Sequence, residues 1–182
     1  EQFTKIMKEY QVDGYEAYAA AALRDVSNEL FILDQIRIRT GLTVHVLSNS
    51  EHRFISYKSV AMRSEVEEMI KTGAAVVDVG GGTTGISILK DGKVIYTDDE
   101  ATGGSHMTMI VAGHYNIPYE EAEILKTDRS KEAEIFPVIK ATVEKMATIT
   151  QKFLNGYQVP AVYVAGGSAS FRDFTAVFEK KL

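Results

Sequence analysis

A run of three glycines directly after a short apolar segment is the feature that most constrains how this chain can fold. Residues 74–79 read AAVVDV, which is typical of a buried strand, and residues 80–85 read GGGTTG. Glycine has no Cβ, so such a loop lets the backbone approach a bound group closely and direct its N–H groups at it. The segment predicts either an anion-binding turn or a hairpin whose glycines only shape the bend.

A second glycine turn follows another β-rich segment near the C-terminus. A strand is predicted over 161–165, and Gly166, Gly167 and Ser168 lead from it into a helix predicted over 171–182. Small residues at a strand-to-helix turn allow a base or a phosphate to come close to the backbone. Alone, this turn indicates a compact loop, but two such turns in one lobe favour a ligand site.

Strand-like and helix-like segments alternate along the chain, which predicts an α/β fold. Helices are expected over 1–10, 28–39, 50–71, 105–113, 118–126 and 137–154, and strands over 42–47, 74–79, 86–89 and 93–97. Asp91 and Gly92 are a strong hairpin signal between the last two of these strands. We expect a boundary near Gly73 that divides a first lobe, residues 1–73, from a second lobe, residues 74–182.

Composition narrows the classes of function. The chain has 20 Lys and Arg against 25 Asp and Glu, a net charge of −5, which gives no electrostatic reason to expect nucleic acid as a partner. The absence of cysteine excludes disulfides and thiolate metal sites, and a reducing cytoplasm fits it. No apolar run approaches the ~20 residues that a membrane-spanning helix needs, so no membrane partner is expected. The oligomeric state is left open.

Three polar side chains in or beside the first glycine turn could bind a phosphate or a metal ion. The Thr83 and Thr84 hydroxyls can donate hydrogen bonds to a phosphate, and Asp78 lies at the end of the predicted strand. Carboxylate plus water is the ligand set that Mg²⁺ prefers, so Asp78 is a candidate metal ligand. From the residues alone, a purely structural hairpin turn stays open as the alternative.

Four motifs in order resemble the second domain of the superfamily that contains actin, sugar kinases and heat-shock chaperone ATPases. The motifs are DVGGGTTG, EATGG, EEAEILK and VAGGSAS, and residues 74–182 are most similar to the EutJ family of ethanolamine-utilisation proteins. The resemblance implies an actin-like ATPase (ribonuclease H-like) fold of two partial lobes with a cleft between them. It also implies ATP and Mg²⁺ as ligands, and a chaperone or assembly role with a protein client in ethanolamine utilisation.

The resemblance assigns roles to individual residues of the second lobe. It implies that phosphate and metal are held by Asp78, Gly80, Gly81, Gly82, Thr83 and Thr84, that Gly103 and Gly104 lie near the phosphates, and that Gly166, Gly167 and Ser168 line adenosine. Glu123 and Lys126 share one face of a predicted helix, and the resemblance implies that they reach the ribose and base. A solvated surface ion pair is the alternative for these two.

The first lobe is similar to a different family of the same superfamily. The segments AALRD at 21–25, GLTVHVLS at 41–48 and EHRF at 51–54 resemble the exopolyphosphatase and guanosine-pentaphosphate phosphatase family. The resemblance implies that Arg24 contacts phosphate and that Glu51 is the catalytic base that positions water. Ordinary surface charge is the alternative for both, with Glu51 as an acid in the first turn of a helix.

Two departures from these families bear on activity. The phosphatase loop carries Ser-Thr-Glu after its glycines, whereas this chain reads Thr83-Thr84-Gly85, as EutJ-like sequences do. The superfamily's first phosphate loop, on an N-terminal hairpin, has no counterpart in these residues, so each lobe is expected to be incomplete. Three functions stay open: a nucleotide-binding module of EutJ type, a hydrolase of phosphoanhydrides such as ATP or polyphosphate, and a non-catalytic fragment or chimera.

Overall fold

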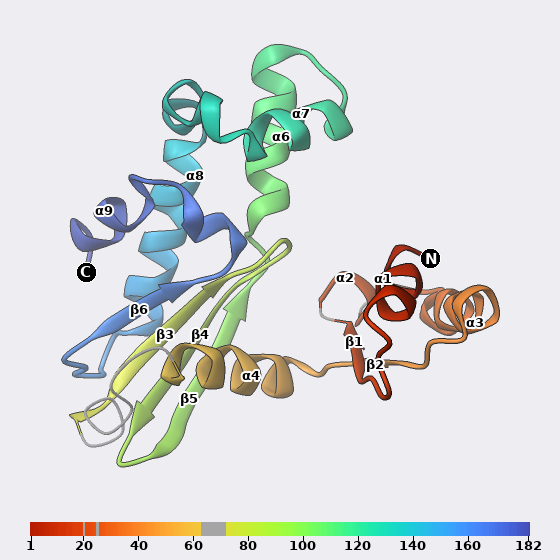
Figure 1. Ribbon diagram of the computed structural model, residues 1–182. Helices are drawn as coiled ribbons and strands as arrows, with labels where there is room; N and C mark the ends of the chain where they lie inside the picture. Colours follow the sequence, from red (N-terminus) through yellow and green to blue (C-terminus); the bar gives the residue numbers. More distant parts are fainter. Residues whose placement is uncertain (20, 25, 63–71) are drawn as a thin grey trace. The chain divides into compact units, whose positions relative to one another are not determined.

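A computed structural model describes residues 1–19, 21–24, 26–62 and 72–182 of the chain (Figure 1). These residues form two compact units, Glu1–His52 and Arg53–Leu182. Helices alternate with strands along both, which confirms the predicted α/β class. The division between the units falls inside helix α4 (Asn49–Ala61), whereas the lobe boundary near residue 73 stays a prediction. The remainder of the helix predicted over 50–71 lies outside the described residues.

The first unit is built on a short parallel strand pair. Its elements are α1 (Gln2–Glu9), β1 (Ala17–Ala19), α2 (Ala21–Arg24), α3 (Glu29–Thr40) and β2 (Val44–Val46). β1 pairs with β2 in parallel, with Ala17 opposite Val44. Gly41 ends α3 in the left-handed conformation at φ +74°, as the predicted helix stop requires.

Few side chains of the first unit are buried. Neither α1 nor α3 contains a buried residue, and Leu47 is the one buried apolar residue among those described in this unit. Arg24 Nη1 donates to the carbonyl oxygen of Leu47 at 3.0 Å, which ties α2 to the end of β2. Strand pairing and polar contacts of this kind therefore order the first unit more than an apolar core does.

The second unit is built on a sheet that has four strands in the described part of the chain. These are β3 (Ala74–Val79), β4 (Thr84–Lys90), β5 (Lys93–Glu100) and β6 (Val162–Ala165), in the spatial order β5-β4-β3-β6. β3 pairs antiparallel with β4 and parallel with β6. Asp91 and Gly92 have φ of +51° and +75°, the left-handed pair that a tight hairpin needs.

Helices cover both faces of this sheet (Figure 1). The helices of this unit are α4, α6 (Gly104–Tyr115), α7 (Tyr119–Thr127), α8 (Glu132–Phe153) and α9 (Phe174–Glu179). α8 and α9 pack on one face, α6 and α7 lie beyond the strand ends, and α4 packs on the opposite face. Among the described residues, no helix combines the length and the apolar character needed to cross a membrane.

The alternation of side chains along β3 explains its continuous apolar sequence. Ala75, Val77 and Val79 belong to the large cluster on the α8 face, while Ala74 and Val76 pack with Tyr57 and Ala61 of α4. A strand that is buried on both faces needs apolar residues at every position rather than at every second one. Asp78, next in the α4-facing series, is therefore a charged residue in a buried layer.

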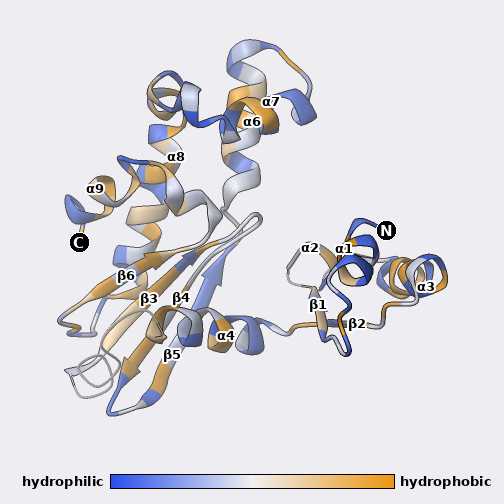
Figure 2. Ribbon diagram, viewed as in Figure 1, coloured by the Kyte–Doolittle hydropathy of each residue, from blue (hydrophilic) through white to orange (hydrophobic). Residues whose placement is uncertain are grey.

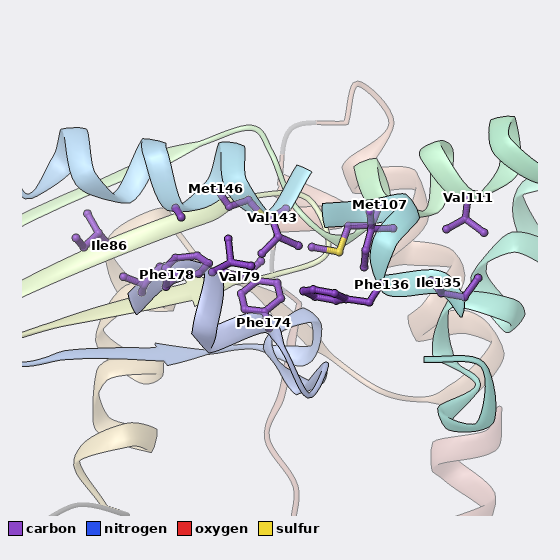
Figure 3. Close-up of a cluster of buried hydrophobic side chains, with 14 of the residues drawn as sticks. Val79, Ile86, Met107, Val111, Ile135, Phe136, Val143, Met146, Phe174 and Phe178 are labelled. Carbon is purple, nitrogen blue, oxygen red and sulfur yellow. The ribbon is translucent and has the colours of Figure 1, made fainter. Parts of the chain in front are cut away.

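The large cluster supplies the core of the second unit. Figure 3 shows its main side chains interdigitating between the sheet, α6, α8 and α9: Val79, Ile86, Met107, Val111, Ile135, Phe136, Val143, Met146, Phe174 and Phe178. In Figure 2, apolar colour follows β3, β4 and β6, while much of β5 is polar. α8 begins at Glu132, so Pro137 lies inside the helix and not in its first turn as predicted.

Truncation of one buried isoleucine tests this packing. Ile139 of α8 is fully buried, whereas Ile124 of α7 is 71% exposed. Ile139→Ala is expected to lower the free energy of unfolding by about 2–5 kcal/mol, because it removes buried apolar atoms and leaves a cavity. Ile124→Ala makes the same chemical change and should alter it by about 0.5 kcal/mol or less. Urea unfolding measures both, and equal losses would contradict the assignment of the core.

Candidate functional site

Two glycine turns of the second unit touch each other at the end of β3. The first is Gly80–Thr83, between β3 and β4, and the second is the turn at Gly103 that leads into α6. A Cβ on Gly103 would lie 2.7 Å from the carbonyl oxygens of Gly80 and Gly81. The two turns are thus packed backbone to backbone, and a side chain at Gly103 would separate them.

The third glycine turn, after β6, reaches the same place. Because β3 and β6 are parallel, the loops that follow them leave the same edge of the sheet. Gly166 has φ +100°, and a Cβ there would lie 2.3 Å from the Val79 carbonyl oxygen, so only glycine fits. A Cβ on Gly104 would lie 2.6 Å from Ser168 Oγ, so this third loop also adjoins the start of α6.

Hydrogen bonds between the first two turns orient the backbone amides. Gly104 N donates to Gly80 O at 2.9 Å, and Ser105 N donates to Gly81 O at 2.7 Å. In a trans peptide the C=O of one residue and the N–H of the next point in opposite directions, so the N–H groups of Gly81 and Gly82 point away from α6. Both residues are exposed, and within the described residues neither N–H has a hydrogen-bond partner. Adjacent free amides of this kind form an anion-binding concavity.

The other polar groups of the first turn are largely engaged. Gly80 N donates to Thr83 O at 2.9 Å, which closes the turn. Thr84 is fully buried as the first residue of β4, and its Oγ1 donates to the Thr102 carbonyl oxygen at 2.6 Å. Thr102 is 1% exposed, and its own Oγ1 has no hydrogen-bond partner in the described part of the chain. Main-chain amides are therefore available as donors in the first turn, whereas the Thr84 hydroxyl is engaged; the Thr83 oxygen accepts from Arg53, and its hydroxyl hydrogen is not used in that bond.

Asp78 is held by two side chains from α4. Arg53 Nη1 donates to Asp78 Oδ2 at 3.2 Å, and Ser56 Oγ donates to the same oxygen at 2.7 Å. Arg53 Nη2 also donates to Thr83 Oγ1 at 3.3 Å. The two charged side chains are only 3% and 10% exposed, so they form a buried ion pair in which loss of either partner is costly.

Gly85 provides the space for the Arg53 guanidinium. It is the cross-strand neighbour of Asp78 in the β3–β4 ladder. A Cβ at this position would lie 2.1 Å from Arg53 Cζ. Sequence reasoning gave no role to Arg53 or Ser56. Their i,i+3 spacing on one face of α4 was the available signal.

These contacts bear directly on the predicted metal site. Mg²⁺ demands near-ideal octahedral oxygen ligation, and it is usually held by one or two carboxylates with waters and substrate phosphates. Asp78 Oδ2 already accepts two hydrogen bonds, one of them from a guanidinium cation. Among the described residues, no group of three or more acidic or histidine side chains is placed to hold a metal. The residues present do not fit direct Mg²⁺ ligation while Arg53 is in place, and the metal role of Asp78 stays a prediction.

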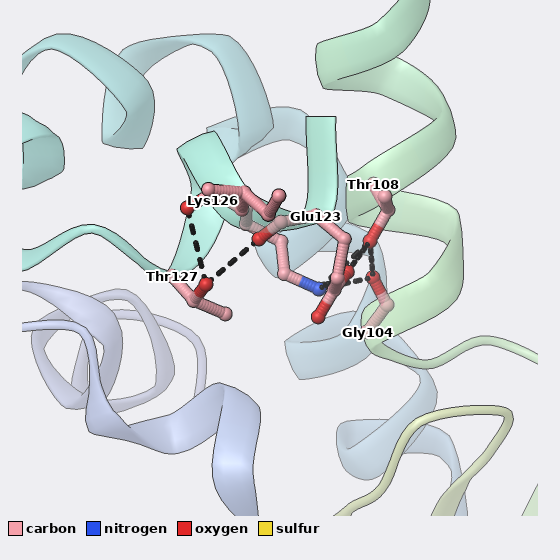
Figure 4. Close-up of polar contacts among 6 residues, drawn as sticks. Gly104, Thr108, Glu123, Lys126 and Thr127 are labelled. Atoms are coloured by element: carbon pink, nitrogen blue, oxygen red, sulfur yellow. Dashed lines mark hydrogen bonds and ion pairs between the residues drawn. The ribbon is translucent and has the colours of Figure 1, made fainter. Parts of the chain in front are cut away.

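Lys126 joins α7 to the start of α6 (Figure 4). Its Nζ lies 2.6 Å from Glu123 Oε2, 2.8 Å from Thr108 Oγ1 and 3.1 Å from the Gly104 carbonyl oxygen. Thr108 also donates to Glu123 Oε2. The Lys126 side chain is 9% exposed and that of Glu123 43%. Lys126, Glu123 and Thr108 thus form a half-buried hydrogen-bond network that contacts the Gly104 carbonyl. The predicted contact of Glu123 and Lys126 with ribose and base stays a prediction.

The two predicted catalytic residues belong to the first unit and make structural contacts there. Ser48 donates its N–H at 2.9 Å and its hydroxyl at 2.7 Å to Glu51 Oε2, and Glu51 N donates to Ser48 Oγ at 3.3 Å. This is a capping box at the start of α4, which the S-x-x-E spacing could have indicated. The bonds from Ser48 lower the pKa of Glu51, away from the neutral range that suits a general base. Catalytic roles for Glu51 and Arg24 stay predictions.

The structure therefore gathers most of the predicted residues in one unit. At or beside the three turns of the second unit lie Asp78, Gly80, Gly81, Gly82, Thr83, Thr84, Gly103, Gly104, Glu123, Lys126, Gly166, Gly167 and Ser168. Arg53, Ser56 and Thr108 join them without having been predicted.

Solved structures with the same fold define the class of protein. The structure of EutJ from Carboxydothermus hydrogenoformans aligns with 98% of this chain and 65% of its own, with 31% identity and a TM-score of 0.70. An exopolyphosphatase from Cytophaga hutchinsonii aligns with 90% of this chain and 47% of its own, with 14% identity and a TM-score of 0.57. The chain has the predicted actin-like ATPase fold. Because one EutJ structure spans both halves, their resemblance to two families does not require two origins.

Sequence comparison narrows this class to a family. A family model described as type IV pilus assembly protein PilM matches residues 7–182, and the chain belongs to this family. It is also 48% identical over 108 residues to the ethanolamine utilization protein EutJ of Salmonella typhimurium, which covers 59% of this chain and 38% of that protein. The chain thus spans less than two thirds of the length of either EutJ relative.

Alanine at Gly103 tests the contact between the first two turns. The added Cβ would lie 2.7 Å from backbone atoms that cannot rotate away. Gly103→Ala is therefore expected to cost at least about 1 kcal/mol of stability, as overpacking does. Gly113→Ala is the matched control, because it adds the same methyl group to α6 in open space and should stabilise by roughly 0.5–1 kcal/mol. Thermal unfolding compares the two, and a neutral Gly103→Ala would contradict the packed turns.

The Lys126 network predicts a pH-dependent contribution to stability. Burial raises the pKa of Glu123, but hydrogen bonds from Lys126 and Thr108 and the Lys126 charge outweigh it, so the pKa lies below its ordinary value of 4.5. A lowered pKa stabilises the fold above pH 4.5, and this stabilisation is lost as pH falls through the folded-state pKa. The stability lead of the wild type over Glu123→Gln should therefore shrink from about pH 6 to about pH 3. Urea midpoints measure it, and a stability lead that does not change over this pH range would contradict the network.

Proposed function

We propose that this chain is a nucleotide-binding module of EutJ type that takes ATP together with Mg²⁺. The observation that carries the proposal is the pair of exposed amides at Gly81 and Gly82, which have no hydrogen-bond partner among the residues that the structure describes. Hydrogen bonds from such amides to a phosphate are charge-assisted, and they are stronger than those between neutral groups. The absence of side chains on both residues allows the phosphate chain to lie directly against the backbone.

The neighbouring groups suit the nucleoside half of ATP. Apart from its chain neighbours, no described residue comes within 4 Å of a Cβ built on Gly167, so the approach to that backbone is open, while Ser168 adjoins the start of α6. Glu123 is 43% exposed and offers carboxylate acceptor capacity near Gly104, whereas the Nζ donors of Lys126 are engaged by Glu123, Thr108 and Gly104. A ribose hydroxyl can donate to such a carboxylate.

Mg²⁺ enters the proposal as a companion of the phosphates. When bound, the metal would neutralise phosphate charge without requiring a vacant carboxylate on the protein. Asp78 stays with Arg53 and Ser56 in this arrangement. In this arrangement the metal would bind to the phosphates of ATP. The protein provides the backbone amides and keeps the Arg53–Asp78 ion pair intact.

The role of such a module follows from its relatives only as a proposal. Similarity to EutJ over part of both chains supports a chaperone or assembly function in ethanolamine utilisation, with a protein client. Hydrolysis of polyphosphate or another phosphoanhydride has less support, because Glu51 caps α4 and position 85 carries no acid. A scaffold that binds no phosphate is the remaining alternative.

Replacement of Gly82 separates binding from folding. A Cβ at Gly82 comes within 4 Å of none of the residues that the structure describes, its chain neighbours aside, so Gly82→Ala should leave the unfolding temperature unchanged. The methyl group would, however, occupy the approach to the free amides, and the affinity for ATP–Mg²⁺ should fall by roughly tenfold or more, the cost of about one charge-assisted hydrogen bond. Titration calorimetry measures the affinity, with Gly113→Ala as the control that should bind as the wild type does.

The same calorimetry, together with a phosphate-release assay, separates the three functions. Heat with ATP–Mg²⁺ and much less with tripolyphosphate supports the nucleotide module. Phosphate release from short-chain polyphosphate supports the hydrolase. If neither compound gives heat or releases phosphate, the proposal is rejected and a scaffold that binds no phosphate is the remaining alternative.

A further inference from the structure

Helix α3 of the first unit directs large apolar side chains toward solvent. Leu30, Phe31 and Ile38 are 82%, 64% and 66% exposed, and α3 contains no buried residue. At 3.6 residues per turn, these three positions lie within about 100° of one another around the helix axis. An apolar stripe of that width normally faces a core. In the described part of the chain it faces solvent instead, so this side of α3 is suited to a contact with another surface.

Two opposite charges lie in the middle of the same side of the helix. Arg37 Nη2 donates to Asp34 Oδ1 at 2.7 Å, and the two side chains are 64% and 48% exposed. An exposed ion pair of this kind contributes little to the stability of the helix itself. We define the α3 face as Leu30, Phe31, Asp34, Arg37 and Ile38. Along the helix, this face carries apolar, negative, positive and apolar groups in that order.

The order of these groups is complementary to its own reverse. If two copies pair with their α3 helices antiparallel, Phe31 of each copy lies opposite Ile38 of the other. The same arrangement places Asp34 of each copy opposite Arg37 of the other. A two-fold axis makes each of these contacts twice, because both copies use the same surface. A parallel pairing would instead place Asp34 against Asp34, and like charges across an interface are strongly unfavourable.

We propose that the α3 face is a homodimer interface, against which a second copy of this chain packs with the two α3 helices antiparallel. Association covers the three apolar side chains and exchanges the ion pair within each helix for two ion pairs between helices. α3 has 12 residues and is about 18 Å long, so the contact is small. We therefore expect a dissociation constant in roughly the micromolar range. The proposal is independent of nucleotide binding, because the whole α3 face belongs to the first unit.

Sedimentation equilibrium of the full chain, from about 1 to about 500 µM, measures the dimer dissociation constant. Phe31→Glu and Ile38→Glu each place a carboxylate against an apolar side chain of the other copy, and each should raise this constant by roughly tenfold or more. Ile124→Glu is the matched control, because it makes the same change at an isoleucine of α7 that is 71% exposed, and it should leave the constant unchanged. Circular dichroism shows that the variants compared are folded.

Charge reversal tests the pairing of the two helices. Asp34→Arg gives the α3 face two positive charges, and Arg37→Asp gives it two negative charges. Each variant alone should dimerise roughly tenfold more weakly than the wild type, because like charges then face each other. An equal mixture of the two should form heterodimers about as readily as the wild type forms homodimers. Native mass spectrometry distinguishes these heterodimers from either homodimer by mass.

Three results would overturn the proposal. A wild type that stays monomeric over the whole concentration range shows that a second copy does not cover the α3 face. A dimer whose dissociation constant is the same in Phe31→Glu and Ile38→Glu has its interface elsewhere. Heterodimers of the charge variants that are tenfold or more tighter than the wild-type dimer indicate parallel helices. Weakening by both apolar variants, with recovery in the mixture of charge variants, supports the antiparallel dimer.

Discussion

The hydrogen bonds that join the Gly80–Thr83 turn to the start of α6 are the constraint on which the site depends. The first amides of a helix have no partners within the helix and must find acceptors elsewhere. Here the carbonyl oxygens of Gly80 and Gly81 accept from Gly104 and Ser105. Because each peptide is planar, satisfying α6 in this way turns the next two amides outward. One requirement thus caps a helix and directs two exposed amides away from it.

Local sequence predicted the parts of this site that depend on local backbone, and missed those that depend on tertiary contact. The strand 74–79 and the Asp91–Gly92 hairpin match the structure, because hydrophobic runs and left-handed turns are set by neighbouring residues. The first turn was predicted to extend to Gly85, but pairing with β3 brings Thr84 and Gly85 into β4. The Arg53–Asp78 pair joins residues 25 positions apart, which no periodicity reveals.

The two faces of the sheet carry different kinds of side chain. The α8 face carries the large cluster of valine, isoleucine, methionine and phenylalanine side chains, which contributes most of the buried apolar area. The α4 face carries a smaller cluster around Tyr57 and Val76, and then the ion pair at the strand end. A buried ion pair is weak evidence for stability, because desolvation offsets much of the attraction. The pair lies at the end of β3, directly before the glycine turn.

The residue at position 85 relates the Arg53–Asp78 ion pair to the resemblance to the EutJ and phosphatase families. A glutamate there, as the phosphatase loop carries, would place a Cβ 2.1 Å from Arg53 Cζ, which is a collision. The chain therefore holds either an acid at 85 or a guanidinium over Asp78, but not both in this geometry. With glycine at 85, the buried layer gains a fixed cation and has no carboxylate at that position to orient water. Since hydrolysis needs a positioned acid or base near the phosphate whereas binding needs only charge balance, the exchange favours a nucleotide binder over a hydrolase.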